Sequence, residues 1–265
     1  MTVDRPRLLL LHGTLSSRVV WGRLRRELGD GVTCIAPDLP GFGQNRWQGE
    51  DYTLEALVDA MQPVVARESP THVVGHSMGA IVALALAARH PGRFQRLGII
   101  GLPVYEDRRR ALAFLGGRGR VVRTFLRSDR LSHVACLGAS ATFPAWQQLA
   151  RRRMPLYSRA ILRSAFDHCG AAHGAFETIV FAGHAGELAA AVSDPVAVLH
   201  GEADRAAPIL PVGRIAETRG WHLTVDPEAN HQVLFQRPRF TANWIRERVL
   251  APLREAAAEL PAAGA

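Results

Sequence analysis

The sequence contains no lysine, so all 32 of its basic residues are arginine. They outnumber 24 acidic residues and give a net charge of +8. The arginines are scattered, apart from runs at 108–110 and 151–153, and the alanine, arginine and glycine bias is typical of a GC-rich genome. The charge is therefore weak evidence about partners, and we expect no nucleic-acid partner.

Cysteine and long apolar runs are also scarce. Cys34, Cys136 and Cys169 are odd in number and lack metal-ligand spacing, which indicates reduced thiols rather than a disulfide framework. The leucine run 8–11 ends at once in His12-Gly13, so it is too short for a signal-peptide core or a membrane span. We expect a cytoplasmic protein with no membrane span.

Motifs for cofactors are missing as well. The sequence has no phosphate-binding loop, no dinucleotide fingerprint and no Cys/His metal cluster. We therefore expect no cofactor and no metal. Oligomeric state cannot be read from the sequence.

What is present is an alternation of short apolar runs and helical patterns. Continuous apolar strands separated by helices indicate a parallel sheet covered on both faces. Strands are expected at 7–11, 32–36, 72–75, 96–101, 196–200 and 221–225, and helices at 20–28, 54–67, 78–89 and 240–259.

The alternation of strand and helix patterns is interrupted between residues 103 and 192, where no strand pattern occurs. Only helices are expected there, at 109–115, 120–126, 146–153, 158–169 and 176–191. We therefore predict a core formed by residues 1–102 and 193–265, with a helical insertion at 103–192.

The pentapeptide Gly75-His76-Ser77-Met78-Gly79 stands between an expected strand and an expected helix. A serine with a glycine two residues to either side can occupy a tight strand-to-helix turn that exposes its hydroxyl. Serine is a poor nucleophile at neutral pH and needs a histidine base, itself oriented by a carboxylate. Ser77 is therefore a candidate nucleophile.

Asp204 and His231 follow the last two expected strands, and the carboxyl ends of parallel strands meet at one edge of a sheet. They are the candidate acid and base, in the chain order Ser, Asp, His. Thr14 follows the first strand, and its N–H and that of Met78 would form an oxyanion hole. Asp194 lies at the wrong end of its strand, and Glu202 comes two residues early.

Other polar residues near these positions are expected to have structural roles. Asp38 follows a strand and is interpreted as a cap on a turn. His12 and His200 are expected to brace neighbouring loops, and His76 to pack or to donate a hydrogen bond within the turn.

With these motifs the chain resembles serine hydrolases of the α/β-hydrolase fold that carry a helical cap. The resemblance covers residues 6–250 and rests on His12-Gly13, Asp38-Leu39-Pro40-Gly41-Phe42-Gly43, Gly75-His76-Ser77-Met78-Gly79, Gly201-Glu202-Ala203-Asp204 and Asn230-His231. It implies an α/β fold, with a mostly parallel doubly wound sheet and a cap inserted after the sixth core strand. In such proteins the cap roofs the active site.

The expected activity is cleavage of a small-molecule ester, thioester or lactone through an acyl-enzyme on Ser77; a carbon–carbon bond beside a ketone remains open. A biosynthetic cyclase or acyltransferase, or a ligand-binding protein with a vestigial site, are the alternatives. Serine at position 77 excludes haloalkane dehalogenases and epoxide hydrolases, which need a carboxylate nucleophile. The absence of lysine excludes hydroxynitrile lyases that use a catalytic lysine.

Overall fold

A single parallel sheet of six strands organises the chain. The computed structural model describes residues 5–45, 52–116, 130–131, 134, 137–138, 141–153, 163 and 169–251. The strand order is β2-β1-β3-β4-β5-β6, and every neighbouring pair is parallel. The strands are β1 (Arg7–Leu11), β2 (Thr33–Ile35), β3 (His72–His76), β4 (Arg96–Ile100), β5 (Val196–Gly201) and β6 (His222–Asp226). All six expected strands are confirmed.

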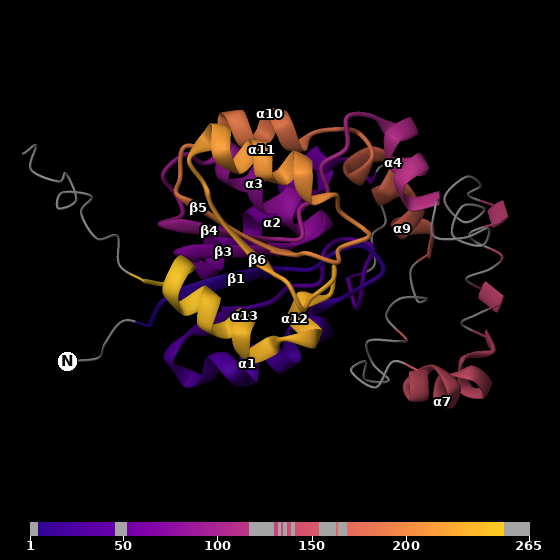
Figure 1. Cartoon of the computed structure of the whole chain (residues 1–265). Helices are drawn as coiled ribbons and strands as arrows, with labels where there is room; N and C mark the ends of the chain where they lie inside the picture. Colours follow the sequence, from indigo (N-terminus) through magenta and orange to yellow (C-terminus); the bar gives the residue numbers. More distant parts are fainter. Residues whose placement is uncertain are drawn as a thin grey trace, which may run out of the picture.

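Helices cover both faces of this sheet (Figure 1). On one face lie α2 (Leu54–Glu68), α3 (Met78–Arg89), α10 (Ala185–Ala191) and α11 (Ile209–Arg219); on the other lie α1 (Gly22–Leu28), α12 (Val233–Gln236) and α13 (Pro238–Trp244). Leu9 and Leu11 of β1 belong to the first apolar cluster, whereas Leu8 and Leu10 belong to the second. Successive side chains of a strand point to opposite faces, so a run of leucines fills both cores. The doubly wound α/β fold is confirmed.

Short 3₁₀ and π-helical segments extend several of these helices. They are η1 (Arg18–Trp21), η2 (Gly29–Gly31) and η4 (Ile245–Val249). The last expected helix, 240–259, thus begins earlier, at Pro238, and its part beyond residue 251 lies outside the described residues.

The segment between β4 and β5 contains helices and no strand among its described residues. Its elements are α4 (Arg108–Gly116), α7 (Phe143–Arg153), α9 (Cys169–Ala175), the π-helix η3 (Phe176–Val180) and α10. It follows β4, the fourth of the described strands, and its assignment as a cap after the sixth core strand of the fold stays a prediction. The expected helix at 120–126, and nearly all of that at 158–169, lie outside the described residues.

The single helix expected at 176–191 is wrong. The chain leaves the helix after η3 and resumes it only at α10. Gly183 has a φ of +80°, a left-handed conformation that no helix continues through and that favours glycine. The break lets α10 pack against α3 and α11 over the sheet.

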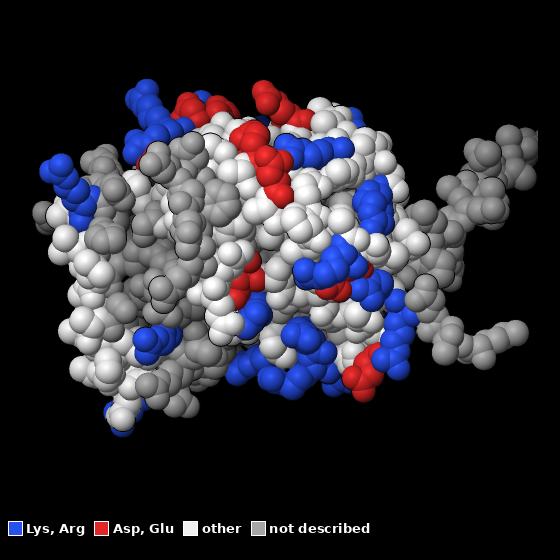
Figure 2. Space-filling model, turned by 180° about the vertical axis from the view of Figure 1, so that it is seen from behind, with Lys and Arg blue, Asp and Glu red and all other residues white. Residues whose placement is uncertain are grey.

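Charged side chains of both signs are interspersed over the face seen in Figure 2, and several basic ones gather along its lower edge. In the described part of the chain, no helix is both long and apolar enough to cross a membrane.

Candidate active site

Ser77 lies at the turn between β3 and α3, where the backbone is strained. Its φ of +56° with ψ of −122° is a conformation that non-glycine residues rarely adopt. A Cβ on Gly75 would come within 2.2 Å of the Gly79 carbonyl oxygen, and one on Gly79 within 2.2 Å of the Leu11 carbonyl oxygen. Both glycines are thus needed for the turn to pack against itself and against β1. Ser77 itself is half-buried, between neighbours that are buried.

Asp204 and His231 meet through a hydrogen bond. Asp204 follows β5 and His231 follows β6, and His231 Nδ1–H donates to Asp204 Oδ2 over 2.7 Å. The other carboxylate oxygen accepts from the backbone N–H groups of Ala206, at 2.6 Å, and Ala207, at 2.8 Å. The Asp204 side chain is 1% exposed and the His231 side chain 14%. The carboxylate is therefore fixed on both oxygens.

The pKa of Asp204 is lower than its ordinary value. Burial on its own would raise this pKa, but the hydrogen bond and charge of His231, together with the two backbone donors, outweigh the burial. Asp204 is therefore ionised at neutral pH and holds the proton of His231 on Nδ1. That tautomer leaves Nε2 of the imidazole free to accept a proton.

The end of β4 connects the serine turn with this pair. Ser77 N–H donates to the Ile100 carbonyl over 2.9 Å. The next residue, Gly101, has a φ of +58°, and a Cβ there would lie 3.1 Å from His231 Nδ1 and 3.6 Å from Asp204 Oδ2. Ser77, Asp204 and His231 are thus brought to one edge of the sheet, as the strand-end argument predicted. Their catalytic roles stay a prediction at this point.

The expected oxyanion-hole residues flank the serine. A Cβ on Gly13 would lie 2.9 Å from Ser77 Cβ, so the loop after β1 passes directly over the serine. Thr14 follows Gly13 in this loop, and Met78 is the first, buried residue of α3. The backbone of both residues lies beside Ser77, and their role as donors remains a prediction.

Residues expected to brace the neighbouring loops do so. His12 is fully buried; its Nδ1–H donates to the Gly13 carbonyl, and Nε2 accepts the Leu39 N–H over 3.0 Å. Burial lowers the pKa of His12 to about 4, which keeps the ring neutral. Asp38 accepts the backbone N–H groups of Arg18, at 2.7 Å, and Gln44, at 2.9 Å. These interpretations are confirmed.

His200 lies beneath the acid loop. Its Nε2–H donates to the Ala207 carbonyl over 3.1 Å, and the same nitrogen is 3.5 Å from Asp204 Oδ2. Burial lowers the pKa of His200, so it is a neutral support of the acid loop. The rival carboxylates lie elsewhere: Glu202 is exposed, and Asp194 precedes β5, where it faces the Gly92 N–H.

Sequence reasoning missed two contacts at this edge. His76 was expected to bond within its own turn, but its Nε2–H donates to the carbonyl of His231 over 2.8 Å. Tyr105, just after β4, donates its hydroxyl to the Ala206 carbonyl in the acid loop. Both contacts join residues about a hundred or more positions apart. The only sequence signal for either was a polar group beside a strand end.

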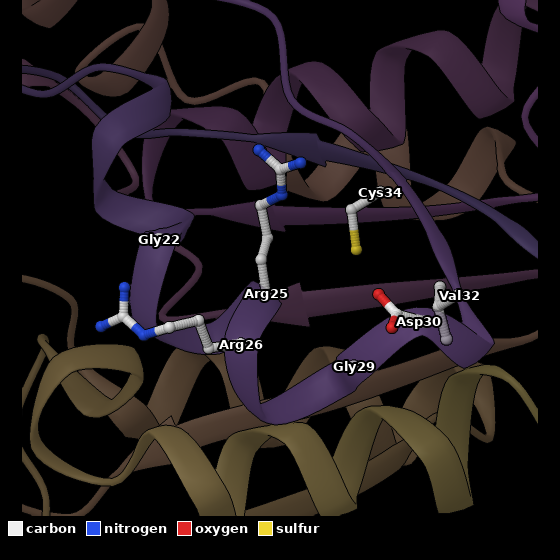
Figure 3. A pocket seen from close by; sticks show the side chains of 7 residues that line it. All are labelled: Gly22, Arg25, Arg26, Gly29, Asp30, Val32 and Cys34. Carbon is white, nitrogen blue, oxygen red and sulfur yellow. The ribbon is translucent and has the colours of Figure 1, made fainter.

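The pocket shown in Figure 3 lies between α1 and β2 and contains none of the five predicted site residues. Its volume is about 680 Å³. The Cys34 sulfur and the Asp30 carboxylate project into it, whereas Arg26 points away. Among the described residues, no group of three His, Cys, Asp or Glu side chains could hold a metal ion.

Comparison with known proteins gives matches over most of the chain. The model of a family described as "Alpha/beta hydrolase family" matches residues 8–244. A thermophilic esterase from Thermogutta terrifontis, solved with malate bound, superposes with a TM-score of 0.68 at 24% identity, over 91% of this chain and 88% of that one.

Two curated relatives match shorter stretches. A pimeloyl-(acyl-carrier protein) methyl ester esterase from Aromatoleum aromaticum is 41% identical over 99 residues, 37% of this chain and 38% of the relative. Lipase LipV of Mycobacterium tuberculosis is 34% identical over 103 residues, 38% of this chain and 39% of the relative. The chain thus spans about two fifths of the length of these relatives.

Proposed function

The chain belongs to the alpha/beta hydrolase family, and from this premise we propose that it is a serine hydrolase that cleaves a small-molecule carboxylic ester through an acyl-enzyme on Ser77. The observation that carries the proposal is the 2.7 Å bond between His231 Nδ1 and Asp204 Oδ2, at the same sheet edge as the strained Ser77. Two curated relatives are named as an ester esterase and a lipase, which supports an ester substrate.

In the proposed mechanism the Ser77 hydroxyl attacks the ester carbonyl carbon, and His231 Nε2 takes the hydroxyl proton. Asp204 keeps the imidazole in the required tautomer and stabilises the imidazolium that forms. The N–H groups of Thr14 and Met78 stabilise the oxyanion of the tetrahedral intermediate. His231 then protonates the leaving alkoxide, and a water molecule, deprotonated by the same imidazole, releases the acid and regenerates Ser77.

The proposal includes a helical cap, residues 103–192, over a core of residues 1–102 and 193–265. In Figure 1, α4 and α9 lie at the right of the view, beyond one end of the strands. This is the carboxyl end of the strands, and Ser77, Asp204 and His231 lie in the segments that follow β3, β5 and β6. The bond from Tyr105 to the Ala206 carbonyl ties the start of this segment to the acid loop. These observations support a cap that shapes the acyl pocket.

Replacing Ser77 by Ala tests the proposed nucleophile. We expect the Ser77→Ala variant to lose hydrolysis of p-nitrophenyl acetate and labelling by a fluorophosphonate probe, because no other group at the turn can form the acyl-enzyme. Ser193→Ala is the matched control, since Ser193 is exposed and precedes β5, at the amino edge of the sheet. Undiminished turnover in Ser77→Ala, or an equal loss in the control, would overturn the proposal.

A further inference from the structure

His76 and His231 form a contact that the proposed mechanism does not use. His76 is the last residue of β3, is 5% exposed and immediately precedes Ser77. Its Nε2 lies 2.8 Å from the carbonyl oxygen of His231, and the two rings are 4.9 Å apart at 43°. A carbonyl only accepts hydrogen bonds, so Nε2 must carry the proton, and the tautomer of His76 is set by this contact.

His76 is unsuited to act as a second base. Burial, with smaller contributions from the neighbouring His231 and His12, lowers its pKa to about 3, even though the bond to the His231 carbonyl and the charge of Asp204 act in the opposite direction. The ring of His76 is therefore neutral at neutral pH. Its one N–H is committed to the carbonyl, so His76 offers a constant neutral donor and no transferable proton.

The contact joins the nucleophile turn to the backbone of the residue that would deprotonate it. Among the described residues, the hydrogen bond that holds the side chain of His231 runs from Nδ1 to Asp204. A ring held at one nitrogen can pivot about that bond, which swings Nε2 toward or away from the serine. A bond from the residue next to Ser77 to the His231 carbonyl restrains this motion, because it fixes the backbone from which the ring extends.

We propose that His76 is a positioning residue: its Nε2–H, bonded to the His231 carbonyl, holds the imidazole of His231 at the correct distance from Ser77. This inference rests on the proposed function. A misplacement of reacting groups by about 1 Å costs on the order of 100-fold in rate. Loss of the donor should thus lower kcat by about 10- to 100-fold and change KM less than about twofold, because the buried His76 offers a substrate almost no surface.

The test compares donor and non-donor variants of His76. His76→Phe keeps a ring of similar size without the N–H, whereas His76→Gln keeps an N–H donor of similar reach. We expect kcat and the fluorophosphonate labelling rate of the Phe variant to fall by about 10- to 100-fold. Both rates of the Gln variant should be within about fivefold of those of the parent. If the Phe variant does not fold, His76→Met, which is flexible and has no donor, replaces it.

His72→Phe is the matched control. His72 lies on the same strand, is 4% exposed and bonds Thr71 Oγ1, at the opposite end of β3. The His72→Phe substitution should lower the thermal midpoint but leave kcat of the folded enzyme unchanged. The proposal is overturned if His76→Phe keeps kcat within twofold, if Gln fails to restore it, or if His72→Phe shows the same loss per folded molecule.

The outcome for His76 is distinguishable from that for the proposed function. If the parent reacts through Ser77 and His76→Phe is as fast as the parent, only the positioning role is wrong. If the parent shows neither turnover nor fluorophosphonate labelling that depends on Ser77, the proposed function is wrong and the role of His76 is refuted with it.

Discussion

Replacing Asp204 by Asn would change the tautomer of His231 while hardly changing the shape of the site. One oxygen of Asp204 accepts the Ala206 and Ala207 N–H groups, at 2.6 and 2.8 Å, and the other accepts His231 Nδ1–H at 2.7 Å. An asparagine has one oxygen, and the two backbone donors retain it. Its NH₂ group must then face His231, where it would meet another N–H donor.

Two donors cannot share one hydrogen bond, so the imidazole must move its proton from Nδ1 to Nε2. In that tautomer Nε2 is already protonated and cannot accept the proton of Ser77. In triads of this kind the same Asp-to-Asn change lowers kcat about 10⁴-fold for this reason. We expect a loss of about 10³- to 10⁴-fold in kcat for Asp204→Asn, which corresponds to about 4 to 5.5 kcal/mol in activation free energy.

The assay is steady-state hydrolysis of a p-nitrophenyl ester, with the fluorophosphonate labelling rate and the thermal midpoint measured on the same sample. KM should change little, because the Asp204 side chain is 1% exposed and cannot reach a substrate. Glu202→Gln is the control, since it removes one charge from the same loop at an exposed position. A folded Asp204→Asn variant with kcat within tenfold of the parent would refute the tautomer argument, as would an equal loss in Glu202→Gln.

Two further predictions concern stability. Gly79→Ala would drive a Cβ to within 2.2 Å of the Leu11 carbonyl oxygen and 2.6 Å of that of His12, so we expect it to lower the free energy of unfolding by several kcal/mol in urea titrations. Gly22→Ala, in open space at a helical φ of −58°, should leave it unchanged or raise it by about 0.5–1 kcal/mol, and equal midpoints for the two variants would contradict this reasoning. The second prediction is that acid destabilises the protein, because burial lowers the pKa of His12 from 6.5 to about 4. Between these values the unfolded chain binds the proton and the folded protein does not, so the free energy of unfolding should fall by about 3 kcal/mol from this residue as the pH drops from 7 to 4. Urea titrations at successive pH values measure this fall, and a flat profile would contradict it.

The sheet and the site edge were predictable because they follow from short-range rules. Continuous apolar runs such as Leu8–Leu11 have one stable location in a two-sided α/β fold, between two helical layers. Once the strands are parallel, all residues that directly follow them gather at one edge. The proximity of Ser77, Asp204 and His231 could therefore be predicted from their positions after the strands, without knowledge of any side-chain contact.

Helix boundaries between β4 and β5 were less predictable. Residues 176–191 follow a helical pattern, but they include Gly183 and Gly186, and neither glycine by itself shows that the chain must stop after η3. It turns at Gly183 because α10 packs on α3 and α11, a tertiary contact that outweighs local propensity. A glycine inside a helical pattern is tolerated at a cost of about 1 kcal/mol relative to alanine, so the sequence left both outcomes open.

The contacts that refine the site depend on where loops meet. His76 reaches the carbonyl of a residue 155 positions away, and this requires both the turn at Ser77 and the loop after β6 to be in place. A polar residue beside a nucleophile can equally face its own turn, the core or another loop. The loop after β6 determines which of these occurs. It places the His231 carbonyl next to the buried ring of His76, which would otherwise have no hydrogen-bond partner in place of water. A buried N–H without a partner costs about 1–3 kcal/mol, so this carbonyl and the ring stabilise each other's position. The same bond that satisfies a buried polar group would thereby restrain the proposed base, His231, beside the proposed nucleophile, Ser77.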